Sequence, residues 1–81
     1  MNEIKIFENV EFGAIRTVEI KNEPWFVGKD VAEVLGYSNT MKAIRDHVKD
    51  NHKLAERIVL SGQTREAILI DEAGVYSLIM H

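Results

Sequence analysis

Residues 28–49 read GKDVAEVLGYSNTMKAIRDHVK, and this stretch decides the fold class. Its first half has apolar residues at i, i+3 and i+4 from Val31, which predicts a short helix over residues 29–35. Gly36 follows, where helices often end in a residue of positive φ that glycine adopts without steric cost. We therefore expect a sharp turn at Gly36.

A second amphipathic helix is predicted over residues 40–49, with Ser38 or Asn39 as the residue that caps its first amides. Its apolar stripe, which we expect to be buried, consists of Met41, Ile44 and Val48. Two short helices joined by a tight turn that contains glycine form the pattern of a helix-turn-helix.

Strands are predicted before this helical pair. Residues 3–7 alternate between apolar and polar, and so do residues 11–21 except at Ile15 and Arg16, which break the alternation. Residues 25–27 form a short apolar run after a turn that contains Pro24. On the second strand we expect Val18 to point inward and Thr17 to lie on the polar side. The first third of the chain should therefore form a small antiparallel sheet.

Beyond the helical pair, residues 50–54 look irregular. Residues 57–60 and 66–70 are β-rich and flank the polar residues 61–65, which is typical of a hairpin with a longer loop. Asp71 is a good N-cap for a final helix. The apolar stripe expected on that helix consists of Val75, Leu78 and Ile79.

The predicted fold class is therefore α+β. A small N-terminal antiparallel sheet is followed by a helix-turn-helix-like pair, a β-hairpin wing and a C-terminal helix, the order of a winged helix. At 81 residues the chain has room for one domain, and 46% hydrophobic with 28% charged residues is a globular balance.

Several classes of protein are excluded by composition. The chain has no Cys, so it has no disulfide framework or thiolate zinc site, which suits a reducing compartment. No apolar run approaches the roughly 18 residues of a membrane span. We expect a cytoplasmic protein that does not contact a membrane.

The charge is unevenly distributed. The net charge is −3, but residues 37–65 carry six bases and three acids, whereas both flanking segments are acidic. A polyanion would therefore bind to the middle of the chain.

The second predicted helix carries the first candidate contacts. Lys42, Arg45 and Lys49 fall at i, i+3 and i+7, beside the apolar stripe, where they could contact DNA phosphates or bases. The alternative is a solvated charged face, because Asp46 is spaced to neutralise both lysines.

The predicted hairpin adds polar donors near the same segment, with the alternative that they form an ordinary polar loop. The complete set of candidate DNA-binding residues is Asn39, Thr40, Lys42, Arg45, Lys49, Lys53, Arg57, Gln63, Thr64 and Arg65.

Enzymatic patterns are weak. His47 and His52 are five residues apart and do not share a helical face, and the adjacent Asp71 and Glu72 suit a helix start better than an acid/base pair. We expect no catalytic residue, no metal and no cofactor.

Three blocks of sequence together resemble the N-terminal domain of the Bro family, which occurs in phage and prophage antirepressors and in baculovirus repeated-open-reading-frame proteins. The blocks are PWFVGKDVAEVLGYSN at residues 24–39, KAIRDHV at 42–48 and IDEAGVYSLI at 70–79. The resemblance implies that residues 1–81 are a domain that binds double-stranded DNA, at the N-terminus of a longer regulator. It also implies a further C-terminal region, through which a homo-oligomer could form.

The competing hypothesis is a protein-interaction module that inactivates a phage repressor by direct contact. DNA binding releases counterions and depends steeply on salt, whereas a protein partner would bind through a more apolar patch.

Overall fold

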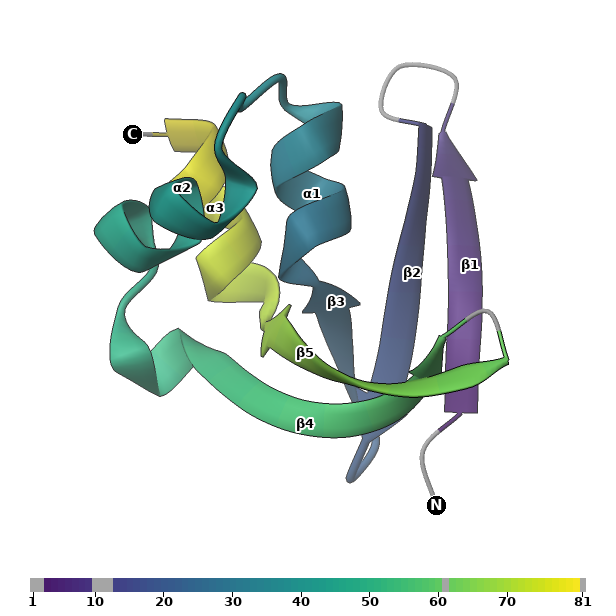
Figure 1. The fold of residues 1–81 in the computed structure, drawn as a ribbon. Helices are drawn as coiled ribbons and strands as arrows, with labels where there is room; N and C mark the ends of the chain where they lie inside the picture. The colour runs from purple at the N-terminus through teal and green to yellow at the C-terminus, as the bar shows by residue number, and fades with distance from the viewer. Residues whose placement is uncertain (1–2, 10–12, 61, 81) are drawn as a thin grey trace.

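A computed structural model describes the backbone of residues 3–9, 13–60 and 62–80. Within these ranges, five antiparallel strands form one sheet in the order β1-β2-β3-β5-β4, and three α-helices gather beside it (Figure 1). The α+β class predicted from the sequence is confirmed. In chain order the elements are β1 Glu3–Asn9, β2 Gly13–Ile20, β3 Glu23–Val27, α1 Gly28–Val34, α2 Thr40–His47, the 3-10 turn η1 Asp50–His52, β4 Lys53–Leu60, β5 Gln63–Ile70 and α3 Glu72–Met80.

The C-terminal hairpin is part of the same sheet as the N-terminal strands. β5 pairs with β3 through Phe26 opposite Ile70 and Val27 opposite Leu69. β4 pairs with β5 over its whole length and forms one edge of the sheet. The sequence indicated a small sheet and a hairpin, but not that two residue pairs join them.

Both hairpin strands are longer than the sequence predicted. Residues 50–54 form η1 and the start of β4, not an irregular segment, because Lys53 and Leu54 pair with Ile70 and Leu69. β5 begins at Gln63, so the polar residues expected in a loop belong to a strand. Pairing with a long partner strand overrides weak local β propensity here.

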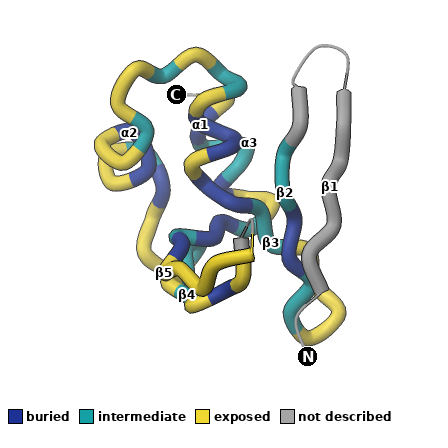
Figure 2. The backbone as a smooth tube through the Cα atoms, turned by 45° about the vertical axis from the view of Figure 1, so that its right-hand side comes forward, coloured by how far each residue is buried: buried dark blue, intermediate teal, exposed yellow. Residues whose placement is uncertain are grey.

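The helices cover one side of the sheet. The buried residues Val31, Ile44 and Leu78, one from each helix, pack with Ile70 of β5 in a single cluster, the helix-side cluster. Tyr37, half-buried after α1, packs against this cluster, and its hydroxyl donates a hydrogen bond of 2.7 Å to the carbonyl oxygen of Leu78. Figure 2 shows buried residues along the inner side of α1 and exposed residues along much of α2.

A second cluster lies on the opposite side of the sheet. Leu69 and Val18 are completely buried there and pack with Val27, and Trp25 adds a half-buried ring. Thr17 stands opposite Phe26, which packs against the helix-side cluster, so Thr17 is 3% exposed and does not lie on a polar face as expected. The sheet therefore connects two small cores.

Each predicted helix boundary signal is present. Gly36 has φ +90°, and the amides of Gly36 and Tyr37 donate to the carbonyl oxygens of Glu33 and Ala32 at 3.0 Å, which is a Schellman motif. Asp71 Oδ1 accepts a hydrogen bond of 2.8 Å from the amide of Gly74 and caps α3.

Two predicted apolar stripes were partly wrong. Met41 is 56% exposed, and α2 instead buries Ala43 beside Ile44. The short helix turns its Ala43 side to the core, which leaves Met41 at the edge of the buried face of α2. α3 buries Gly74 and Leu78, whereas Ile79 is 48% exposed.

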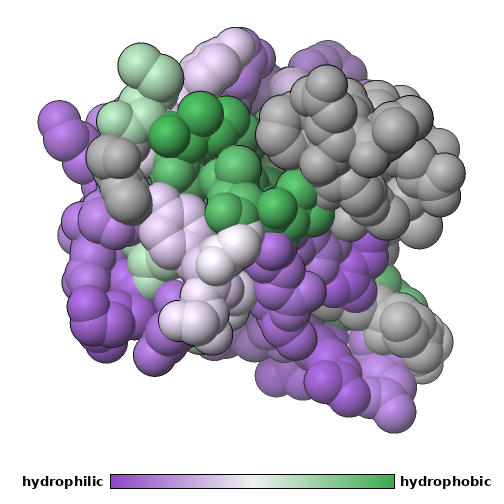
Figure 3. Space-filling model, turned by 90° about the horizontal axis from the view of Figure 1, so that it is seen from above, coloured by the Kyte–Doolittle hydropathy of each residue, from purple (hydrophilic) through white to green (hydrophobic). Residues whose placement is uncertain are grey.

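α3 turns its Gly74 side inward because its backbone closely approaches β5 and η1 there. A Cβ atom at Gly74 would lie 3.0 Å from Cβ of Ile70 and 3.2 Å from the carbonyl oxygen of His52, so the backbone of α3 sits directly on the sheet. The opposite side of α3 exposes Tyr76, Ile79 and Met80. Seen from above, the molecule carries an apolar patch, and polar surface adjoins the lower edge of that patch (Figure 3). No helix in the described ranges is long and apolar enough to cross a membrane.

Candidate nucleic-acid interface

α2 is fixed at its start by Asn39 and along its inner side by the core. The side chain of Asn39 accepts a hydrogen bond of 3.1 Å from the amide of Lys42, while Ala43 and Ile44 are buried. Asn39 is therefore a capping residue in this structure. Thr40, the first helical residue, is half-buried.

The outward side of α2 carries Lys42, Arg45 and Asp46. Lys42 Nζ lies 2.9 Å from Asp46 Oδ2, and Arg45 Nε lies 3.6 Å from Asp46 Oδ1. The hydrogen bond from Lys42 lowers the pKa of Asp46, although desolvation opposes the shift. The neutralising role foreseen for Asp46 is thus present, but ion pairs this exposed are weak and leave two cations to one anion.

Lys49 is not on this helix, contrary to the prediction. α2 ends at His47, and Val48 has extended backbone angles, with φ −105° and ψ 123°. Burial of the Val48 side chain draws the chain away from the helical path. Lys49 is exposed, but it no longer aligns with Lys42 and Arg45 at helical spacing.

Two further candidates, Lys53 and Arg57, lie on β4 and have acidic partners close by. Lys53 has a side chain only 19% exposed, and its Nζ lies 3.5 Å from Asp50 Oδ1. Arg57 is exposed and stands directly opposite Glu66 in the ladder. Each of these cations has an acid beside it.

The other predicted candidates lie at the start of β5. Gln63, Thr64 and Arg65 are all exposed. The guanidinium of Arg65 donates to Oε1 of Gln63 at 2.6 and 3.1 Å. This partner is neutral, so the charge of Arg65 is not cancelled by it.

A pocket of about 390 Å³ brings α2 and β5 together. Arg65 from β5, Met41 from α2 and Lys29 from α1 all border it, along with Arg16 from β2. α2 and the hairpin, predicted separately as DNA-contacting elements, therefore adjoin one hollow. Sequence reasoning missed Lys29 and Arg16, and the one available signal was that Arg16 interrupts the alternation of its strand.

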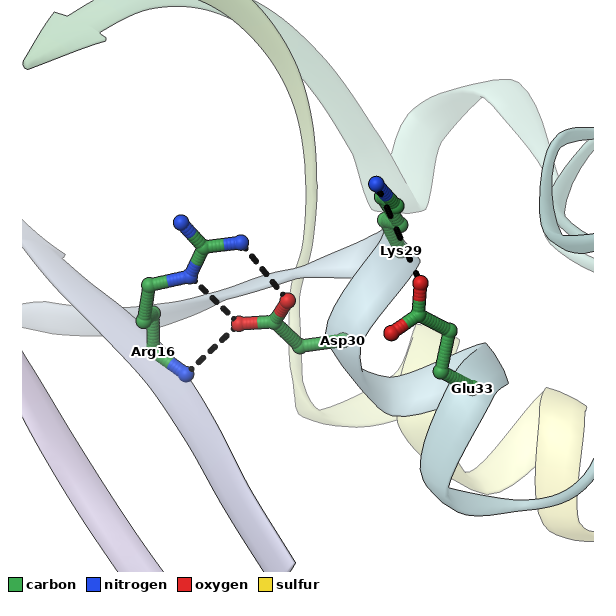
Figure 4. A network of polar contacts seen from close by, with 4 residues as sticks. All are labelled: Arg16, Lys29, Asp30 and Glu33. Atoms are coloured by element: carbon green, nitrogen blue, oxygen red, sulfur yellow. Dashed lines mark hydrogen bonds and ion pairs between the residues drawn. The ribbon is translucent and has the colours of Figure 1, made fainter. Parts of the chain in front are cut away.

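Arg16 joins β2 to the start of α1. Its Nε and a second guanidinium nitrogen donate to the carboxylate of Asp30 at 2.7 and 2.8 Å, and its backbone amide adds a third bond of 3.0 Å (Figure 4). Burial raises the pKa of Asp30, but the bonds and charge of Arg16 outweigh it, and the net pKa is lowered. The hydrogen bond to Asp30 raises the pKa of Arg16 in turn.

Lys29 is more available than Arg16. Its Nζ lies 3.8 Å from the carboxylate of Glu33, and both side chains are more than half exposed. The structure therefore surrounds the pocket with one locked cation, Arg16, and two accessible ones, Lys29 and Arg65. Among the described residues no group of three His, Cys, Asp or Glu side chains could hold a metal ion.

Comparison with known proteins identifies the family. Residues 14–81 match the BRO family, N-terminal domain. An uncharacterized protein of Haemophilus influenzae is 37% identical over 74% of this chain and 30% of its own length. The Bro-N domain-containing protein 201R of Invertebrate iridescent virus 6 is 33% identical over 82% of this chain and 20% of its own length.

The chain spans less than a third of the length of these two relatives. No solved structure matches it significantly. The family match runs from the second residue of β2 through α3, and it includes all the described residues that border the pocket. The resemblance drawn from the three sequence blocks is confirmed, and the chain belongs to the BRO family through its N-terminal domain.

Proposed function

We propose that this chain is the DNA-binding domain of an antirepressor-type transcriptional regulator of a phage or prophage, acting on double-stranded DNA in the cytoplasm. Membership of the BRO family supports the proposal. So does the concentration of positive charge in the middle of an otherwise acidic chain.

One structural observation carries the proposal: Met41 of α2 and Arg65 of β5 border the same pocket. Lys42 and Arg45 next to Met41 can therefore approach one duplex together with the hairpin residues Gln63 and Thr64. A recognition helix and a hairpin that contact DNA side by side are what a winged arrangement requires.

Arg45 is the proposed base reader and Lys42 the proposed phosphate contact. A planar guanidinium can donate two parallel hydrogen bonds to guanine, whereas an ammonium acts as a point charge. DNA phosphates would replace Asp46 as the partner of Lys42, which costs little because the existing pair is exposed.

The test uses the full-length protein that contains this chain and the DNA upstream of its own gene. We expect binding to weaken steeply between two salt concentrations, because phosphate contacts release counterions. Lys42→Ala should weaken binding to every sequence and reduce the salt slope by about 1. Arg45→Ala should cost about 1 to 3 kcal/mol and relax the preference at one base pair.

Lys21→Asn is the matched control. Lys21 is exposed in the turn between β2 and β3, at the opposite end of β3 from the pocket, and has φ 51°, which Asn tolerates. Its loss removes one positive charge and should leave the affinity almost unchanged. Equal weakening by Lys21→Asn and Arg45→Ala would mean that only the net charge matters. Undiminished binding by a folded Lys42→Ala/Arg45→Ala variant would rule out α2 as the contact surface.

A further inference from the structure

Part of β5 lacks a strand partner on its β3 side among the described residues, although β5 is an inner strand of the sheet. β3 ends at Val27, opposite Leu69, and the chain then leaves the sheet as α1. Residues 63–68 of β5 therefore have a strand partner in β4 but none on their other side, within the part of the chain that the structure describes.

The backbone groups along this edge point away from β4. The amide of Asp71 donates to the carbonyl oxygen of His52, on the β4 side, at 3.1 Å. In an antiparallel ladder alternate residues turn both backbone groups to the same neighbour, so Thr64, Glu66 and Ile68 turn theirs away from β4. The position of Gly28 agrees, because a Cβ atom there would lie 3.2 Å from the carbonyl oxygen of Ile68.

The pocket of about 390 Å³ runs along this edge. The four consecutive residues Arg65 to Ile68 all border it. Successive side chains of a strand point to opposite faces, so a hollow on one face would touch only alternate residues. Contact with four in succession places the hollow beside the strand, where a further strand would lie.

The walls of the pocket favour an acidic occupant. Arg16, Lys29 and Arg65 border it, against Glu66 as the one acid among the described residues that line it. The charge of Arg16 is held by Asp30, whereas Arg65 bonds to the neutral Gln63. Val27 and Met41 supply apolar surface between these charges.

We propose that this pocket binds an extended peptide of a partner protein, which adds to β5 as a strand and places an acidic side chain beside Arg65 and Lys29. Addition of a strand draws affinity from backbone hydrogen bonds and specificity from alternate side chains. The bonds would form with the backbone groups of Thr64 and Glu66. The peptide would bind through backbone groups of β5, whereas the contacts proposed with DNA are made by side chains of α2 and the hairpin.

A peptide fits the edge better than a nucleic acid does. Each outward-facing residue offers one N–H donor and one C=O acceptor. A phosphate has only acceptors and would leave the carbonyl groups of Thr64 and Glu66 unsatisfied. A second strand offers both in the same alternating order.

The experiment selects random peptides of about six residues, a usual strand length, against the full-length protein. We expect the selected peptides to alternate β-branched residues with polar ones and to carry Asp or Glu. The decisive variants are Glu66→Pro and Glu66→Thr. Both remove the carboxylate, but only proline removes the N–H that points into the pocket, and it leaves the ladder with β4 intact.

Glu66→Pro should bind the selected peptides about tenfold or more weakly than Glu66→Thr does, because it lacks one backbone hydrogen bond to the peptide. N-methylation of the peptide provides a second measurement on the unaltered protein. Methyl groups on one alternate set of amides should abolish binding, while those on the other set should be tolerated, because only one set faces β5.

Either of two results would overturn the proposal. One is a selection that enriches no acidic, alternating peptide. If Glu66→Pro then lowers the affinity for DNA, the pocket is part of the DNA-binding surface. The other is peptide binding that is equally sensitive to N-methylation at every position, since strand addition requires alternation.

Discussion

At the scale of single residues, Asp30 is the clearest source of pH-dependent stability. Burial alone would raise its pKa, but Arg16 lowers it below the usual 3.8. The stabilisation is therefore fully present above about pH 4 and is lost as the pH falls through the lowered pKa of the folded state. Asp30→Asn should reduce the free energy of unfolding by about 1 to 3 kcal/mol at pH 7. Urea unfolding at pH 7 and pH 3 should show the difference shrinking at pH 3.

Glu33→Gln is the control for that prediction. Its pair with Lys29 is exposed and spans 3.8 Å, so its loss should change stability by less than about 1 kcal/mol at either pH. A constant difference between the native protein and Asp30→Asn at both pH values would contradict the role given to Arg16.

At the scale of elements, the turn between α1 and α2 depends on Gly36. Its φ of +90° is costly for a residue with a Cβ atom, although no atom within 4 Å would clash with one. Gly36→Ala should therefore lower stability by about 1 kcal/mol through backbone strain alone. Thermal denaturation should show Gly36→Asn to be milder, since Asn tolerates this conformation. An unchanged melting temperature for Gly36→Ala would disprove the strain argument.

The start of α2 depends on one side chain. Asn39 accepts the amide of Lys42, so Asn39→Ala should cost about 1 kcal/mol. Ser38→Ala, at an exposed neighbour that does not cap the helix, should cost much less. Equilibrium unfolding in urea compares the two, and equal losses would show that the cap is not the source of stability.

At the scale of the whole molecule, the sheet should make the two cores unfold together. A domain of 81 residues has a stability of about 4 to 12 kcal/mol. Leu69 is completely buried in the second cluster, and its neighbour Ile70 belongs to the helix-side cluster. Leu69→Ala should cost about 2 to 5 kcal/mol and lower the whole transition.

Circular dichroism of the helices and fluorescence of Trp25 should follow the same unfolding curve in Leu69→Ala. Val59→Ala is the control, because Val59 is 55% exposed and should lose little on truncation. Separate transitions for the helices and for Trp25 would show that the sheet does not couple the cores.

Local signals in the sequence were enough to place the three helices, the end of α1 and the starts of α2 and α3, but not the end of α2. Gly36, Asn39 and Asp71 act on amides and carbonyl groups within a few residues of themselves, so their roles follow from neighbours along the chain. The three sequence blocks also identified the family, because family identity is a property of the sequence.

Only the tertiary structure decided which residues distant in sequence lie next to one another. The pairing of β3 with β5 and the bond between Arg16 and Asp30 join residues that are distant in sequence. The exposure of Met41 depends on how α2 is rotated against the core. The same holds for the candidate surfaces. Residues from β2, α1, α2 and β5 border one pocket because β3 ends at Val27 and leaves space beside β5, and the periodicity of a single segment carries no information about where its neighbour ends.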